Sequence, residues 1–124
     1  MKNINNDKRK TYFIDIDGTL VKHNYDPENI PEEFLPGALD FLKSISSECV
    51  ILTTSRSPEN IKNFLFLLAE YGIVVDHVLT ALPTGTRILI NDYFDELEKK
   101  AISYNVKRNN GLEFLNINNF ESEG

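Results

Sequence analysis

Short apolar runs alternate along the chain with segments in which apolar residues recur every three or four positions. β-branched and aromatic residues dominate the short runs, a composition typical of strands. The predicted strands are residues 12–17, 49–53, 77–80, 87–90 and 101–106. The alternation of strand and helix signals predicts right-handed crossovers between parallel strands, and therefore an α/β fold with a doubly wound parallel sheet and helices on both faces.

Two segments of the chain carry the helical pattern. Pro36 suits the first turn of a helix, and the apolar face that follows it runs to about Ser47. The second helix has clearer ends, because Ser57 is a favourable cap, Pro58 suits the first helical position and Gly72 is a favourable stop.

Polar segments at both ends delimit the expected domain. We expect a flexible lead-in over residues 1–10, a single domain over residues 11–115 and a polar tail over residues 116–124. Within the domain, the prolines and charged residues of positions 18–36 predict an irregular excursion, and residues 111–115 are expected to open a last helix.

The composition limits the classes of partner. The 124 residues carry 19 acidic and 13 basic side chains, and the net charge of -6 disfavours binding to nucleic acid or to an anionic membrane. One cysteine and two histidines argue against a disulfide framework and a zinc site, so any metal is expected to have oxygen ligands. No membrane-spanning stretch or signal-peptide core stands out, so we expect a cytoplasmic protein.

Two carboxylates, Asp15 and Asp17, end the first predicted strand and are followed by Gly18. Ligands of open α/β sheets bind outside the carboxyl ends of the strands, so this is where chemistry is expected. Like charges this close raise a carboxyl pKa unless a cation neutralises them, and Mg²⁺ is a hard ion that prefers carboxylate and phosphate oxygens. The alternative is a solvated pair that only initiates a turn.

Residues 15–20, Asp-Ile-Asp-Gly-Thr-Leu, resemble motif I of the haloacid dehalogenase-like (HAD) superfamily of phosphotransferases. The resemblance implies a Rossmann-like HAD core and a Mg²⁺-dependent phosphomonoester hydrolase. It implies that Asp15 is the nucleophile that forms an aspartyl-phosphate. Asp17 would then protonate the leaving oxygen and later activate water.

The end of the second predicted strand resembles motif II of the same family, in which a Thr or Ser binds the phosphoryl group. Thr54 aligns with that position, the amide of Ser55 is a second donor, and Arg56 adds a planar fork suited to phosphate or carboxylate. Taken alone, the hydroxyl residues are better explained as a strand end and a helix cap, but their position between the other two motifs favours phosphate binding.

Residues 88–92 resemble motif IV, in which acidic residues complete the Mg²⁺ site. The resemblance makes Asp92 a metal ligand, with Asn91 beside it, and so gives a predicted set of Asp15, Asp17, Asn91 and Asp92. The lysine of motif III, which neutralises nucleophile and phosphate in the family, is not evident. Arg87 is the nearest cation in the sequence, and Arg56 is a second candidate from the other loop.

The spacing between the motifs leaves no room for a cap domain, so we expect a capless protein. Residues 18–24, 35–38 and 82–92 also resemble small HAD proteins associated with capsule or lipopolysaccharide sugar pathways. This resemblance implies a small phosphorylated metabolite, such as a sugar phosphate or a nucleotide-like compound, as substrate. A homo-oligomer is compatible with this prediction, because a neighbouring subunit can shield a capless site.

Two other hypotheses stay open. The missing lysine favours a catalytically weak phosphate- or nucleotide-binding regulatory module on the same fold. A receiver-like signalling domain also has an acidic pocket on a doubly wound sheet. It fits less well, because receivers carry the phosphorylated aspartate later in the chain.

Overall fold

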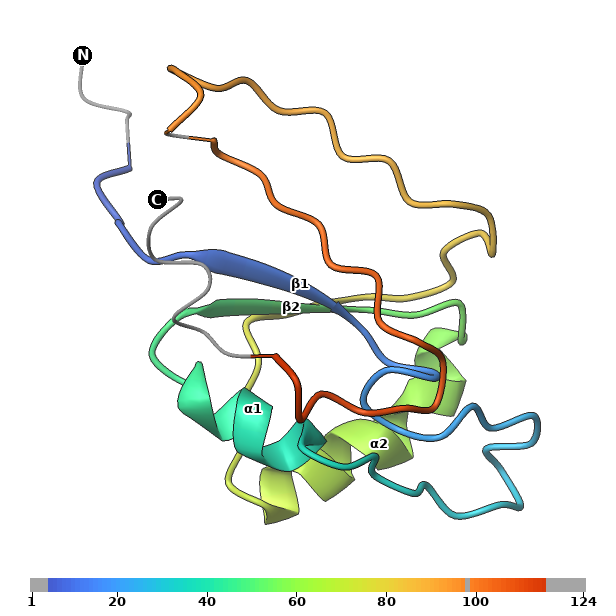
Figure 1. Cartoon of the computed structure of the whole chain (residues 1–124). Coiled ribbons are helices and arrows are strands. Elements are labelled where there is room, and N and C mark those ends of the chain that lie inside the picture. Colours follow the sequence, from blue (N-terminus) through green and yellow to red (C-terminus); the bar gives the residue numbers. More distant parts are fainter. Residues whose placement is uncertain (1–4, 98, 116–124) are drawn as a thin grey trace.

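The computed structural model of the chain describes residues 5–97 and 99–115 (Figure 1). It is a small α/β protein with a parallel sheet of three strands in the order β1-β2-β3. No helix in these two ranges is long and apolar enough to cross a membrane. The elements in chain order are β1 (Thr11–Asp15), α1 (Ala38–Ser44), β2 (Cys49–Thr53), α2 (Pro58–Glu70) and β3 (His77–Leu79).

The register of the sheet aligns the carboxyl ends of its strands. Asp15 lies opposite Thr53, and Thr53 lies opposite Leu79 on the other side. The pairing continues past the strands, because the amide of Ile16 donates to the carbonyl of Thr53 over 3.1 Å and the amide of Thr54 donates to that of Leu79 over 3.0 Å. The residues that follow β1 and β2 therefore lie side by side.

Both helices cover the same face of the sheet (Figure 1). Two right-handed crossovers that move in the same direction place their helices in this way. The core lies between this face and the helices, and it includes Ile14, Ile16, Leu42, Val50, Leu52, Ile61, Phe64 and Leu68. Because the three described strands follow chain order, they contain no reversal of strand order, and the doubly wound topology with helices on both faces stays a prediction.

The ends of α2 lie where the sequence signals place them. The hydroxyl of Ser57 accepts a hydrogen bond from the amide of Asn60 at 3.2 Å, and Pro58 takes the first helical position. Gly72 follows the helix with a φ of 76°, a conformation that favours glycine. The predicted limits of α2 are confirmed because each depends on a local rule.

Four expectations differ from the structure. The first helix is shorter than predicted, Ala38–Ser44, and residues 111–115 form a turn instead of a helix. Residues 87–90 and 101–106 are not strands, and they run along the side of the sheet away from the helices (Figure 1). An apolar run becomes a strand only when its backbone pairs with another strand, and these residues have no partner strand among those described. The side chains of Ile88 and Ile90 are accordingly exposed.

The ends of the chain are described only in part. Residues 5–10 form no helix or strand, although the carbonyl of Lys10 accepts a hydrogen bond from the amide of Cys49 at 2.9 Å. The first four residues of the predicted lead-in and the whole predicted tail, residues 116–124, lie outside the described residues.

Residues 109–112, near the end of the described chain, form hydrogen bonds with the loops that follow β1. The amide of Asn109 donates to the carbonyl of Gly18, and its side-chain oxygen accepts from the amide of His23, both at 2.8 Å. Three residues later, the amide of Leu112 donates to the carbonyl of Pro36 at 2.8 Å, and the Leu112 side chain enters the core. This segment therefore joins both ends of the excursion after β1 to the rest of the domain.

Gly111 offers a test of this attachment, with Gly72 as a matched control. Both have positive φ, 88° and 76°, but a Cβ at Gly111 would overlap the carbonyl oxygen of Pro36, whereas a Cβ at Gly72 meets nothing within 4 Å. We expect Gly72→Ala to lower the free energy of unfolding by about 1 kcal/mol through backbone strain. Gly111→Ala should cost roughly a further 1–3 kcal/mol through overpacking. Equal losses in urea unfolding would show that the segment does not pack against Pro36.

Candidate active site

A tight turn after β1 presents Asp15 and Asp17 at the carboxyl end of the sheet. Ile16 between them is fully buried, and its carbonyl accepts hydrogen bonds from the amides of Leu20 and Val21 at 3.0 and 3.2 Å. Leu20 and Val21 are themselves fully buried, so the turn is anchored in the core from both sides of Gly18. The carboxylates are thus held where the sequence predicts them.

Asp17 is bound by a buried arginine that also binds a second acid. The Nη2 of Arg56 donates to Oδ1 of Asp17 at 2.6 Å, and its Nε donates to the same oxygen at 3.0 Å. On its other edge, Nη1 and Nη2 of Arg56 donate to the two carboxylate oxygens of Glu32 at 2.6 and 3.0 Å. The side chains of Arg56 and Glu32 are each 7% exposed, and that of Asp17 is 18% exposed.

The charged state of Arg56 is favoured in this arrangement. Burial alone lowers the pKa of its guanidinium, but the hydrogen bonds to Glu32 and Asp17 and the charges of these carboxylates outweigh burial and raise the pKa above its ordinary value. Arg56 is therefore a fixed positive charge between two carboxylates.

Thr54 completes the environment of Asp17. It continues the buried face of β2 and is fully buried. Its hydroxyl donates to Oδ2 of Asp17 at 3.1 Å and accepts from the amide of Arg56 at 3.0 Å. Both carboxylate oxygens of Asp17 are therefore hydrogen-bonded, and the Thr54 hydroxyl is directed at Asp17. The neighbouring Ser55 is exposed, and its hydroxyl bonds to no other residue in the described ranges.

Asp15 has a different environment from Asp17. It forms no ion pair within the described residues, and its Oδ2 accepts from the hydroxyl of Thr19 at 3.3 Å. Partial burial raises the pKa of Asp15, and the charge of Asp17 adds to the rise. The Thr19 hydroxyl and the charge of Arg87 oppose this rise, but the pKa stays above its ordinary value.

Arg87 and Arg108 also lie near this edge of the sheet. The charge of Arg87 reaches Asp15, although its Nη1 donates to the carbonyls of Pro83 and Gly85 at 2.7 and 3.0 Å. Arg108, which sequence reasoning missed, covers the turn, since its Cγ lies 2.9 Å from where a Cβ on Gly18 would be.

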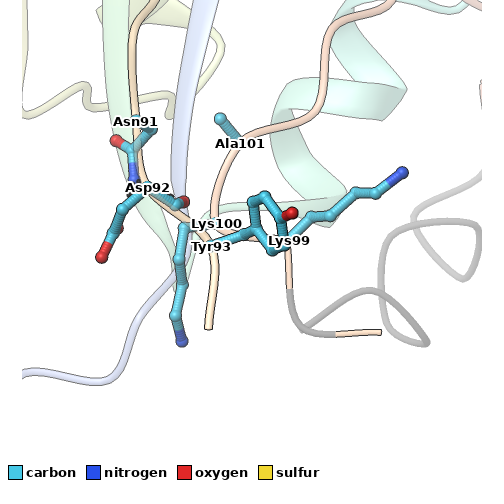
Figure 2. Close-up of a pocket in the computed structure, with 6 residues that line it drawn as sticks. All are labelled: Asn91, Asp92, Tyr93, Lys99, Lys100 and Ala101. Carbon is cyan, nitrogen blue, oxygen red and sulfur yellow. Dashed lines mark hydrogen bonds between the residues drawn. The ribbon is translucent and has the colours of Figure 1, made fainter. Parts of the chain in front are cut away.

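Asn91 and Asp92 belong to a separate arm of the chain, residues 91–101, whose two ends line a pocket. They line a pocket of about 170 Å³ with Tyr93, Lys99, Lys100 and Ala101, where a single bridge joins Tyr93 to Lys99 (Figure 2). Across residues 5–97 and 99–115, no three His, Cys, Asp or Glu side chains are grouped so that they could hold a metal. The structure thus does not bring Asp92 together with Asp15 and Asp17, and the predicted Mg²⁺ set stays a prediction.

Glu32 is the second residue that sequence reasoning missed. It lies in the irregular excursion of residues 18–36, where acidic residues are expected to be solvated. The one available signal is indirect: a buried arginine with five N–H donors requires more acceptors than one carboxylate supplies.

Comparison of the sequence with models of known protein families finds no match. Comparisons with curated proteins and with solved structures find none either. The HAD resemblance therefore depends on the motifs described above.

Replacing Asp15 by Asn should stabilise the fold at neutral pH. Because the folded-state pKa of Asp15 lies above its unfolded value of 3.8, ionisation of Asp15 costs stability as pH rises through the folded pKa, and the cost is absent well below 3.8. We expect the variant to gain stability relative to wild type between about pH 3 and pH 7. The measurement is urea unfolding across this range, with Asp40→Asn on the exposed side of α1 as control. A difference that does not grow with pH would contradict the assignment.

Proposed function

We propose that the protein is a HAD-type phosphomonoester hydrolase that acts on a small phosphorylated metabolite and uses Asp15 as its nucleophile. The observation that carries the proposal is that two nearby carboxylates, those of Asp15 and Asp17, have different environments. Asp17 is held by Arg56 and Thr54, whereas Asp15 keeps part of its surface accessible to solvent and forms no ion pair in the described part of the chain. Two acids with different environments can perform different tasks.

Asp15 suits the nucleophilic task. Its carboxylate oxygen would attack phosphorus and form an acyl phosphate while the bond from phosphorus to the leaving oxygen breaks. Asp17, two residues along the same turn, would donate its proton to that oxygen and then accept one from the water that hydrolyses the acyl phosphate. The buried Ile16 between the two acids keeps their separation fixed.

Binding of a phosphate group requires additional positive charge. Asp15, Asp17 and Glu32 carry three negative charges, which Arg56, Arg87 and Arg108 balance, and a phosphomonoester adds further negative charge. Arg87 and the donors of Ser55 are available at this edge of the sheet for the phosphoryl oxygens. The excess negative charge is also the physical reason to propose a divalent cation.

Mg²⁺ is part of the proposal, with Asp15, Asp17, Asn91 and Asp92 as its predicted oxygen ligands. When bound, it would polarise the phosphoryl group and offset its charge. Asp15 fits such a ligand, whereas the Asp17 carboxylate is occupied by Arg56 and Thr54, and Asn91 and Asp92 lie on a separate arm. We therefore assign no step of the reaction to the ion.

A doubly wound HAD core without a cap domain is also part of the proposal. The parallel order β1-β2-β3 and the two helices on one face are compatible with part of such a core (Figure 1).

A regulatory phosphate-binding module on the same fold is the second candidate. The hydrogen bonds that occupy Asp17 favour it, because Arg56 and Thr54 already bind both of the carboxylate oxygens that would have to serve the leaving group. The absence of the motif III lysine points in the same direction.

Phosphate release from a panel of sugar phosphates, nucleotides and an aryl phosphate tests the proposal. We expect release that depends on Mg²⁺, stops with chelator and falls at least about 1,000-fold in Asp15→Asn, since this variant lacks the nucleophile. Asp40→Asn should retain wild-type rates.

The outcomes separate the two candidates. Release that survives in Asp15→Asn would contradict the nucleophile assignment. If no substrate is hydrolysed but inorganic phosphate binds, the regulatory module is the better description.

A further inference from the structure

The guanidinium of Arg56 lies between two carboxylates and donates hydrogen bonds to both. Its Nε and Nη2 edge binds Asp17, and its Nη1 and Nη2 edge binds Glu32. Four of its five N–H donors, a number fixed by the chemistry of the side chain, are used in these bonds. Because carboxylates bind the planar guanidinium on two edges, its orientation is fixed. The two hydrogen bonds from Nε and Nη2 then fix the orientation of the Asp17 carboxylate as well.

The position of Glu32 is itself fixed by the backbone. The neighbouring residues pair with the turn after β1, since the amide of Lys22 donates to the carbonyl of Glu33 at 2.8 Å and the amide of Leu35 donates to that of Leu20 at 2.9 Å. Val21 and Phe34 form an antiparallel bridge in the same place. Glu32 is thus attached to the same turn that carries Asp17.

If Glu32 were absent, the Nη1 and Nη2 edge of Arg56 would be free to bind a phosphate group. The sequence predicts Arg56 as a phosphate-binding residue, but only one N–H, on Nη1, is left over. A two-point contact with a phosphate would therefore require Arg56 to give up one of its two carboxylates. Breaking a buried pair leaves an uncompensated charge and is strongly unfavourable. The observed contacts therefore favour a role in holding Asp17.

We propose that Glu32 and Arg56 are positioning residues, which orient the carboxylate of Asp17 for proton transfer to the leaving oxygen, and that Arg56 does not bind the substrate phosphate. This inference rests on the proposed hydrolase function. It extends that function to Glu32, a residue outside every motif that the sequence presents.

The leaving group of the substrate distinguishes positioning from general damage. Departure of an alkoxide from a sugar phosphate needs a proton, whereas a nitrophenolate leaves readily without one. A variant with a misoriented Asp17 should therefore lose activity on sugar phosphates and keep most of it on nitrophenyl phosphate. A merely structural defect lowers both activities equally.

The test uses Glu32→Gln and Arg56→Lys, with Glu33→Gln as matched control because Glu33 is adjacent and exposed. We expect kcat/KM for the best sugar phosphate to fall at least about 10-fold more than kcat/KM for nitrophenyl phosphate in the first two variants. Glu33→Gln should change neither. Inhibition by inorganic phosphate should change less than about threefold in Arg56→Lys. Circular dichroism and the Tm identify variants that fail to fold, and Glu32→Asp then replaces Glu32→Gln.

The outcomes distinguish this inference from the proposed function. If wild type hydrolyses no substrate, the proposed function fails, and the positioning role fails with it. If wild type is active and both variants lose activity equally on the two substrates, only the positioning role is overturned. A loss of phosphate inhibition of 10-fold or more in Arg56→Lys would show that Arg56 binds phosphate instead.

Discussion

A buried guanidinium must be surrounded by acceptors, and Arg56 imposes this requirement on the whole edge of the sheet. Its partners come from the turn after β1 and from the excursion of residues 18–36, while Arg56 itself follows β2. Because charges without partners are costly in the interior, these three segments must approach together. The parallel register of β1 and β2 already places the segments that follow them side by side. The ion pairs of Arg56 then fix how the side chains meet.

Features encoded by neighbouring residues could be predicted from the sequence. β2 was predicted with its observed limits, and α2 begins and ends at its cap, proline and glycine signals. The position of Asp15 and Asp17 at a strand end follows from the apolar run before them. In each case the deciding interactions lie within a few positions of one another.

Features that depend on distant partners could not be predicted in this way. Residues 87–90 have the composition of a strand, but strand formation requires an edge to pair with, which no local pattern specifies. Glu32 resembles the other acids of an irregular, charged segment, and only the fold brings it to Arg56. The assembly of Asn91 and Asp92 with the acidic pair is a tertiary question of the same kind.

The hydrogen bonds of Asn109 have a kinetic consequence. Asn109 and His23 lie 86 positions apart, so their contact forms only after a long loop has closed. Closing a loop of this length costs chain entropy before the contact forms, whereas the pairing of adjacent parallel strands closes shorter loops. Opening this one attachment would uncover the acidic turn, which its buried residues and the ion pair of Asp17 with Arg56 would still hold. The covering of the acidic turn by Asn109 is thus a separate property from the stability of the sheet.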